Sequence, residues 1–309
     1  MFTWIKNIWN SLTKSTDQKV KTEEELKDDF KFNFKLGCKK DLKDERDLIK
    51  PKLCASNLNI TSNFSLRQFA PKVRDQGSTS ACGGFAATSA IYILLNKAYN
   101  QSSLEEAKLN SITHFIKVPK LSAFYTYWYA RYFDNSLPED CGVTLRSLMK
   151  SLKEFGAIPE KHVSSSSGVR TKPKVVKDCN SIKINKYFRI PINDETSEQI
   201  KNILLIEQLP IIAGIYLYDS QMYEASKTGY LKPVQDWETA KCIGGHAVCI
   251  TGFKIENDPE TNQPITWYEF QNSWGENTWG DNGYGYIRED MLGHINYMLD
   301  IWCFDKSFW

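Results

Sequence analysis

Two hydrophobic periodicities follow one another along the chain, and their order limits the fold more than any other feature. Up to about residue 163, apolar side chains recur at the spacing of buried helix faces. The helices predicted there cover residues 82–98, 122–134 and 144–156. Beyond that point, short apolar runs separated by turn residues predict strands, with one helix near 197–207. Helices followed by strands predict an α+β fold with two lobes and a cleft between them.

The first 54 residues are predicted to be an extension, because they contain too few apolar residues for a core of their own. Residues 1–14 predict a short amphipathic helix, which either binds a membrane surface or a partner, or packs on its own domain. Residues 15–29 are charged and are predicted to be helical or mobile. From Phe30 to Leu36, apolar residues alternate with lysine and asparagine, which predicts a half-buried strand on another surface.

The chain is therefore predicted to consist of an extension and one main domain. The extension, residues 1–54, would be a propeptide or regulatory belt that controls access to the domain, or else a permanent structural belt. The main domain, residues 55–309, would have its helical lobe at about 72–165 and its β lobe at about 180–309.

Charge and hydropathy exclude several classes of protein. The formal net charge of only +2 gives no reason to expect nucleic-acid binding. The longest apolar run, residues 204–218, is interrupted by Glu207 and Gln208 and is too short to span a membrane. The N-terminus lacks the continuous apolar stretch and small-residue cleavage site of a signal peptide. We expect a monomer that is intracellular or part of a virus particle and is not secreted by the standard route.

Cysteine spacing argues against a metal centre. The eight cysteines are Cys38, Cys54, Cys82, Cys141, Cys179, Cys242, Cys249 and Cys303. They form no CxxC pair, so zinc is not expected, and no metal or other cofactor is predicted. They are also too sparse for the disulfide framework of a small secreted domain. A mostly reduced protein is predicted, with one or two bridges left open.

Three short segments carry residues suited to nucleophilic catalysis. The first contains Gln76 and, at the start of a predicted helix, Cys82. The second contains His246 at the start of a predicted strand, and the third contains Asn272 and Trp274. Each residue alone has an ordinary structural explanation, such as a buried thiol, a packed histidine or a capping asparagine. Their joint occurrence in this order indicates a catalytic site.

The chemistry explains why these residue types belong together. A thiol must become a thiolate to attack a carbonyl, and a helix N-terminus and a nearby histidine both favour that charge at Cys82. The imidazole of His246 would take the proton, and Asn272 would accept from its other nitrogen and fix the ring. The Gln76 amide and the Cys82 backbone N–H would stabilise the oxyanion. Trp274 would shield the hydrogen bond between histidine and asparagine from water.

These segments resemble those of the papain-like, or cathepsin-like, cysteine peptidases. The stretch QGSTSACGGFAAT matches the family pattern around its nucleophile, and HAV at 246, NSWG at 272 and WGDNGYGYI follow in the family order. The segments GCKKDLKDERD and LPEDCGVTLRSLMKSLKEFGAIPE are similar to bacterial and viral branches of the family. The resemblance covers roughly residue 60 to the C-terminus, and it implies a helical lobe and a β-barrel-like lobe with the active site between them.

The resemblance implies a cysteine endopeptidase that hydrolyses protein or peptide substrates by a Cys–His–Asn mechanism and is made as a zymogen. None of the four histidines has a histidine neighbour, so the His–His loop of the related carboxydipeptidases is absent. One alternative is a weak or inactive protein that keeps the fold for binding or structure. Another is acyl transfer, such as peptide ligation, for which the same residues would serve.

The substrate-binding residues implied by the resemblance are Gly84, Gly142, Gly245 and Trp274. Gly142 would lie on the cleft floor and pair with an extended peptide, unless it is an ordinary turn beside a helix. Glycines after Cys82, such as Gly84, would let a substrate backbone approach. Gly245 and its neighbour Gly244 would leave one wall of the specificity pocket small.

The chain departs from the family pattern at two positions near the nucleophile. Thr79 stands where the family has a cysteine that pairs with one near Cys141, so the usual bridge is absent. Gly83 replaces the tryptophan that follows the nucleophile, and this predicts looser packing beside Cys82.

Overall fold

The computed structural model describes residues 27, 30–53, 63–101, 118–164, 169–176, 179–258 and 261–308. The predicted helix at residues 1–14 lies outside them, as does the charged segment after it apart from Lys27. The chain divides into two compact units, Met1–Phe32 and Asn33–Trp309. In the first unit, the described residues make one turn in which the Phe30 N–H donates to the Lys27 carbonyl (3.2 Å). All that follows concerns the second unit, to which the described residues 33–53 belong by their contacts.

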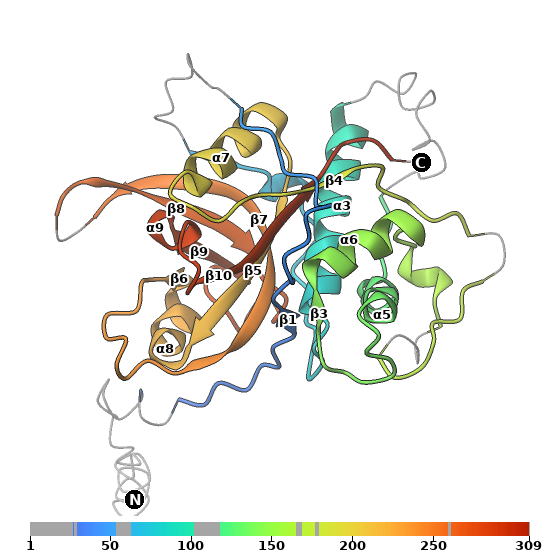
Figure 1. Ribbon diagram of the computed structural model, residues 1–309, viewed down its shortest axis with the longest axis horizontal. Coiled ribbons are helices and arrows are strands. Elements are labelled where there is room, and N and C mark those ends of the chain that lie inside the picture. The colour runs from blue at the N-terminus through green and yellow to red at the C-terminus, as the bar shows by residue number, and fades with distance from the viewer. Residues whose placement is uncertain are drawn as a thin grey trace, which may run out of the picture. The chain divides into compact units, whose positions relative to one another are not determined.

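The three predicted helices are present. They are α3 (Cys82–Gln101), α5 (Ala123–Phe133) and α6 (Leu145–Glu154), and they pack on one another (Figure 1). Hydroxyl side chains begin two of them: Ser122 accepts from the N–H of Tyr125 and Thr144 accepts from the N–H of Ser147. Gly156 follows α6 with φ of +73°, as a glycine that ends a helix should.

The strand-rich half forms one eight-stranded sheet with the order β4-β10-β5-β7-β8-β9-β6, and β2 pairs with β7. The strands are β2 (Phe64–Ser65), β4 (Tyr187–Arg189), β5 (Ile211–Tyr218), β6 (Tyr230–Leu231), β7 (Cys242–Asn257), β8 (Pro264–Gln271), β9 (Tyr284–Arg288) and β10 (Met298–Phe304). All pairs are antiparallel except β6 with β9. The long β7 lies at the centre of the sheet and contacts α3, so the sheet packs against the helices through this pair (Figure 1).

Some elements agree with the prediction and others were not predicted. The helix expected near 197–207 is present as α7 (Thr196–Asn202), followed by a π-helical turn (Ile203–Glu207). The sequence analysis missed α8 (Asp219–Thr228), α9 (Glu289–Leu292) and β10, as well as short 3-10 turns at Arg67–Phe69 and Glu160–His162. Every residue of β10 is buried, so the strand shows no alternation of apolar and polar residues.

The alternating segment is not a strand over the predicted range. From Asn33 to Leu36 its residues alternate between exposed and half-buried, as predicted, but strand pairing begins only with β1 (Cys38–Lys39). β1 pairs in parallel with the two-residue β3 (Val143–Thr144), in a small sheet of its own. Figure 1 shows these two strands running between the large sheet and the helices α5 and α6.

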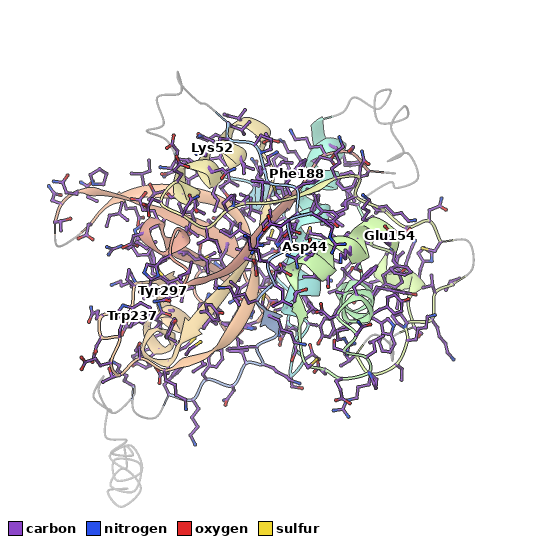
Figure 2. The ribbon with its side chains drawn as sticks, in the orientation of Figure 1. Asp44, Lys52, Glu154, Phe188, Trp237 and Tyr297 are labelled. Atoms are coloured by element: carbon purple, nitrogen blue, oxygen red, sulfur yellow. The ribbon has the colours of Figure 1, made fainter. Side chains whose placement is uncertain are left out.

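A buried cluster of charges attaches the residues after β1 to both halves of the unit. The Asp41 N–H donates to an Asp300 carboxylate oxygen (2.7 Å), and the Trp302 indole donates to the Asp41 carboxylate (2.9 Å). Arg146 of α6 makes a two-pronged ion pair with Asp47 (2.8 and 2.7 Å). Figure 2 shows Asp44 of the same segment beside α6. The segment GCKKDLKDERD, residues 37–47, therefore attaches the chain after β1 to both halves of the unit.

Arg189 of β4 completes this cluster, and we expect its removal to destabilise the fold in a pH-dependent way. Arg189 pairs with Asp300, whose side chain is fully buried, and with Asp47 (3.3 Å). Burial, with help from the neighbouring Asp41, raises the pKa of Asp300 to about 6, so the ionised carboxylate above pH 6 depends on Arg189. Arg189→Met should lower the free energy of unfolding by about 3 kcal/mol at pH 8. The loss should be smaller at pH 5, where Asp300 takes up a proton.

Urea unfolding at the two pH values checks this prediction, with Arg189→Lys as the matched control that keeps the positive charge. The sign follows from the raised pKa: the cost of burying the charge is present above the folded-state pKa and disappears as the pH falls below it. An equal loss at pH 8 and pH 5 would show that Arg189 contributes packing alone.

Candidate active site

Cys82 is the first residue of α3 and is completely buried. Burial raises the pKa of the Cys82 thiol to about 11, against the opposing effect of hydrogen bonds from the backbone of Ala247, Gly83 and Gly37. Ala247 follows His246 on β7, so the packing of α3 against β7 places the Cys82 thiol beside the residue next to His246. In this state the thiol is protonated at neutral pH.

The side chains of His246 and Asn272 are hydrogen-bonded to each other, as the sequence analysis predicted. The distance from His246 Nε2 to Asn272 Oδ1 is 2.8 Å, and Asn272 Oδ1 also accepts the N–H of Ser273 (2.7 Å). A backbone N–H can only donate, so the asparagine atom is the oxygen and His246 Nε2 carries the proton. Among the described residues Nδ1 has no hydrogen-bond partner, and its lone pair is available.

The imidazole is neutral in this arrangement. Burial lowers the pKa of His246 to about 4, although the hydrogen bond to Asn272 works in the opposite direction. Trp274 stacks on the ring with centroids 4.3 Å apart and is itself fully buried. The indole therefore covers the imidazole on one side, where the sequence analysis expected it to exclude water.

Gln76 is oriented by a residue that the sequence analysis did not single out. The Ser273 hydroxyl donates to Gln76 Oε1 (2.6 Å), while Gln76 Nε2 donates to the carbonyls of Thr79 (2.6 Å) and Lys35 (2.9 Å). The loop before α3 is held to the same place, because the Gln76 N–H donates to the Ser273 carbonyl (2.8 Å). Ser273 lies inside the quoted NSWG motif, so its position beside Asn272 was a usable signal.

Residues 34–39, here called the strap, lie over this site. The Lys35 carbonyl accepts from Gln76, as described above, and the Gly37 N–H donates to the Gly245 carbonyl (3.0 Å). The Val143 N–H donates to the Gly37 carbonyl (2.9 Å), after which β1 and β3 pair. The strap is thus bound through its backbone on both sides, as an extended peptide binds to a strand edge.

The first residue of the strap reaches the side of the histidine. Phe34 stacks on Trp274 with ring centroids 4.6 Å apart and an interplanar angle of 12°. Trp274 therefore packs against both Phe34 and His246. With the strap in place, Cys82 is 0% exposed and His246 is 1% exposed. Both reacting residues are therefore closed to any substrate.

Two of the predicted binding glycines face the strap backbone. A Cβ atom on Gly142 would overlap the Gly37 carbonyl, and one on Gly245 would overlap the Cys38 carbonyl. Gly142 has φ of +79°, but its N–H donates to the Tyr127 hydroxyl (3.0 Å), so pairing with the strap begins one residue later than predicted.

The predictions for Gly84 and Gly83 need correction. A Cβ on Gly84 would overlap the carbonyl of Ala123 on α5, so this glycine allows α3 and α5 to pack closely and does not face the strap. A Cβ on Gly83 would lie 2.5 Å from Leu148 Cδ1, so the leucine of α6 already fills the space beside Cys82. Packing there is therefore not loosened.

The described cysteines are all free thiols, and these are all of the cysteines except Cys54. Cys141 is exposed and unbridged, while the hydroxyl of Thr79 donates to the Gln76 carbonyl (2.7 Å) and closes the turn before α3. At the position where the family has a bridging cysteine, Thr79 thus makes a local hydrogen bond. Among the described helices, none is both long enough and apolar enough to cross a membrane.

Comparison with known proteins identifies the family. The model of the papain family of cysteine proteases matches residues 145–299, a range that contains His246 and Asn272. The chain belongs to the papain family of cysteine proteases. This family of hydrolases acts on peptides. A papain-family relative, an uncharacterized peptidase C1-like protein of Acanthamoeba polyphaga mimivirus, is 28% identical over 253 residues, which are 79% of this chain and 74% of the relative.

Solved structures of a cysteine protease and of two procathepsins share the fold. Xylellain, a cysteine protease from Xylella fastidiosa, superposes with a TM-score of 0.66 at 20% identity, over 88% of this chain and 96% of that one. Digestive procathepsin L2 of Tenebrio molitor gives 0.63 at 15% identity, over 92% and 80% of the two chains. The procathepsin B S9 of Trypanosoma congolense gives 0.60 at 14% identity, over 99% and 98%. The predicted papain-like α+β fold is confirmed.

Proposed function

We propose that the protein is a cysteine endopeptidase made as a zymogen, in which its own strap covers the active site. Cys82 is the nucleophile, His246 the general base and then the acid, and Asn272 the residue that orients the imidazole. Gln76 and the Cys82 N–H stabilise the oxyanion. The observation that carries the proposal is the 2.9 Å hydrogen bond from Gln76 Nε2 to the Lys35 carbonyl, because the site already holds a peptide carbonyl there.

The reaction begins once the strap has left. The Cys82 proton passes to His246 Nδ1, and the thiolate attacks the substrate carbonyl carbon, whose oxygen becomes the oxyanion. The imidazolium then protonates the leaving amine and the C–N bond breaks, which leaves a thioester on Cys82. Water, deprotonated by His246, hydrolyses the thioester and restores the thiol.

The direction of the strap explains why it inhibits without being cut. In a productive complex, the amine side of the bond must face His246, which protonates it. The strap has the acyl side of the Lys35–Leu36 bond there instead, because Phe34 packs on Trp274, while Gly37 lies on the opposite side, at Gly245 and Val143. The strap therefore runs backwards relative to a substrate.

The proposal predicts how fast Cys82 reacts with iodoacetamide in the complete chain at each pH. With the strap in place, burial holds the thiol pKa at about 11, so the thiolate fraction at pH 7 is about one in ten thousand and rises with pH into the alkaline range. In a chain whose strap is released, His246 can take the proton, and labelling should already be fast near neutral pH. Peptide mapping by mass spectrometry separates Cys82 from the exposed Cys141 and Cys242, which serve as internal controls.

The same measurements decide against the proposal in two ways. Rapid labelling of Cys82 at pH 7 in the unaltered chain would mean that the strap does not close the site. Failure of the released chain to react with an epoxysuccinyl thiol reagent, or to hydrolyse a peptide, would favour a non-catalytic protein that keeps the fold.

A further inference from the structure

Asp140 is a nearly buried carboxylate beside the active site that the proposed mechanism does not use. It lies shortly before β3, and its side chain is 8% exposed. One of its oxygens forms an ion pair with the ammonium of Lys35 at 2.8 Å. Lys35 is the strap residue whose carbonyl is bound by Gln76. One residue therefore places its carbonyl at the oxyanion position and its positive charge on Asp140.

The carboxylate is held in place by the protein and not by the strap alone. Asp140 Oδ1 accepts the Tyr127 hydroxyl (2.7 Å) and the N–H of Ser80 (3.0 Å), two residues before Cys82. Burial alone would raise the pKa of Asp140, but the hydrogen bonds from Lys35, Tyr127 and Ser80 outweigh it and lower the pKa. Asp140 is thus a fixed negative charge attached to the loop that carries the nucleophile.

We propose that Asp140 selects substrates with lysine or arginine at the acyl residue, the residue whose carbonyl Cys82 attacks. This inference rests on the proposed peptidase function and adds a substrate class to it. The carbonyl of that residue is bound at Gln76 whichever way the peptide runs, and Asp140 lies within one lysine side chain of that point, as Lys35 shows. A long, flexible side chain with a terminal cation can reach the same oxygen from either direction.

The charge also discriminates against other side chains. A glutamate at the acyl residue would bring a second carboxylate against a nearly buried one, which repels it. A neutral side chain of similar length would leave Asp140 without a cation. A charge-assisted hydrogen bond of this kind favours the cationic substrate by about 10- to 100-fold in kcat/KM.

Asp140→Asn is the variant matched to this question. An asparagine can keep its carbonyl oxygen where Oδ1 accepts from Tyr127 and Ser80, and it places an uncharged NH2 where Oδ2 meets the lysine. The substitution therefore removes the charge while conserving the contact with Tyr127 and the shorter of the two contacts with the Ser80 N–H. Arginine in place of lysine in the substrate provides the corresponding control on the other side of the pair.

The test uses the complete chain carrying Gly37→Ala to release the strap, with fluorogenic peptides that differ only at the acyl residue: lysine, arginine, norleucine, glutamine or glutamate. Lysine and arginine peptides should be preferred over norleucine by about 10- to 100-fold in kcat/KM, and Asp140→Asn should reduce that ratio to about 1. A ratio near 1 in the parent chain, or one that Asp140→Asn leaves unchanged, overturns the inference while leaving peptidase activity in place. The substrate preference of the chain that carries Gly37→Ala alone tests the inference, even if the Asp140→Asn variant fails to fold. If no peptide is cleaved and Cys82 is not labelled, the proposed function fails as well.

Discussion

Replacing Cys82 by alanine is expected to lower kcat/KM for peptide hydrolysis by at least about a thousandfold in the strap-released chain. Alanine has no atom that can form the thioester, so the two-step route through a covalent intermediate is lost. The oxyanion donors remain, because Gln76 is held by Ser273 through its own hydrogen bonds (2.6 Å). The residual rate would come from binding and oxyanion stabilisation alone.

Progress curves with a fluorogenic peptide measure this loss, and circular dichroism confirms that the variant is folded. Cys242→Ala is the matched control, since it removes an exposed thiol at the start of β7 and leaves Cys82 on α3 in place. It should retain the parent rate. Hydrolysis that survives Cys82→Ala, or that disappears equally in Cys242→Ala, would contradict the assignment of the nucleophile.

The parts of the site that could be predicted are those in which one residue type serves one chemical role. Cysteine, histidine, asparagine and glutamine each serve few catalytic roles, and their order along the chain indicated one kind of catalytic site. The direct contact of His246 with Asn272 at 2.8 Å is what that logic requires. Likewise, the three helices were predictable because apolar side chains recur at helical spacing in each, and α6 is also followed by a glycine, Gly156, that ends it.

The strap could not be located from the sequence, because its partners are far away along the chain. The alternation from Phe30 to Leu36 predicted a half-buried segment but contained no information on what would bury it. The answer depends on hydrogen bonds that join Gly37 to Val143, more than 100 residues later, and to Gly245, more than 200 residues later. The sequence therefore predicted a belt but did not predict that the Lys35 carbonyl binds to Gln76.

Glycines near the nucleophile were misassigned for a related reason. A glycine can accommodate a ligand, another helix or a neighbouring side chain, and the sequence does not distinguish these uses. Gly84 accommodates α5 and Gly83 accommodates Leu148, whereas Gly142 and Gly245 accommodate the strap. Only the three-dimensional neighbours separate packing glycines from those that contact a peptide backbone.

The extension is attached by two different kinds of contact, and this suggests how the site can open. The strap itself is held by backbone hydrogen bonds, by the stacking of Phe34 on Trp274, by the ion pair of Lys35 with Asp140 and by the buried Cys38. The next residues are held by the buried cluster around Asp41, Arg146 and Asp300. Local opening of the strap therefore does not require the Asp41 cluster to break, and the tethered strap keeps a high effective concentration near Cys82.

Releasing the strap by Gly37→Ala is expected to raise the rate at which Cys82 is labelled at pH 7 by about 100-fold. A Cβ atom at this position would overlap the backbone carbonyl of Ser80, and because the three nearest atoms are all backbone atoms of Ser80, no side-chain rotation can relieve the overlap. The substitution leaves Gln76, Cys82, His246 and Asn272 untouched. Overpacking of this size shifts the equilibrium towards the open state, in which the thiol loses its burial and its pKa falls.

Labelling kinetics of the complete chain with an epoxysuccinyl reagent measure the effect, and Asn33→Ala is the control, since Asn33 is exposed immediately before the strap. Because the strap can move away from Ser80 and so relieve the overlap, the urea midpoint of Gly37→Ala should stay near that of the parent chain. Equal labelling rates in Gly37→Ala and the parent chain would mean that the strap does not limit access. A large fall in the midpoint would instead assign the strap to the folded core, as the permanent belt that the sequence also allowed.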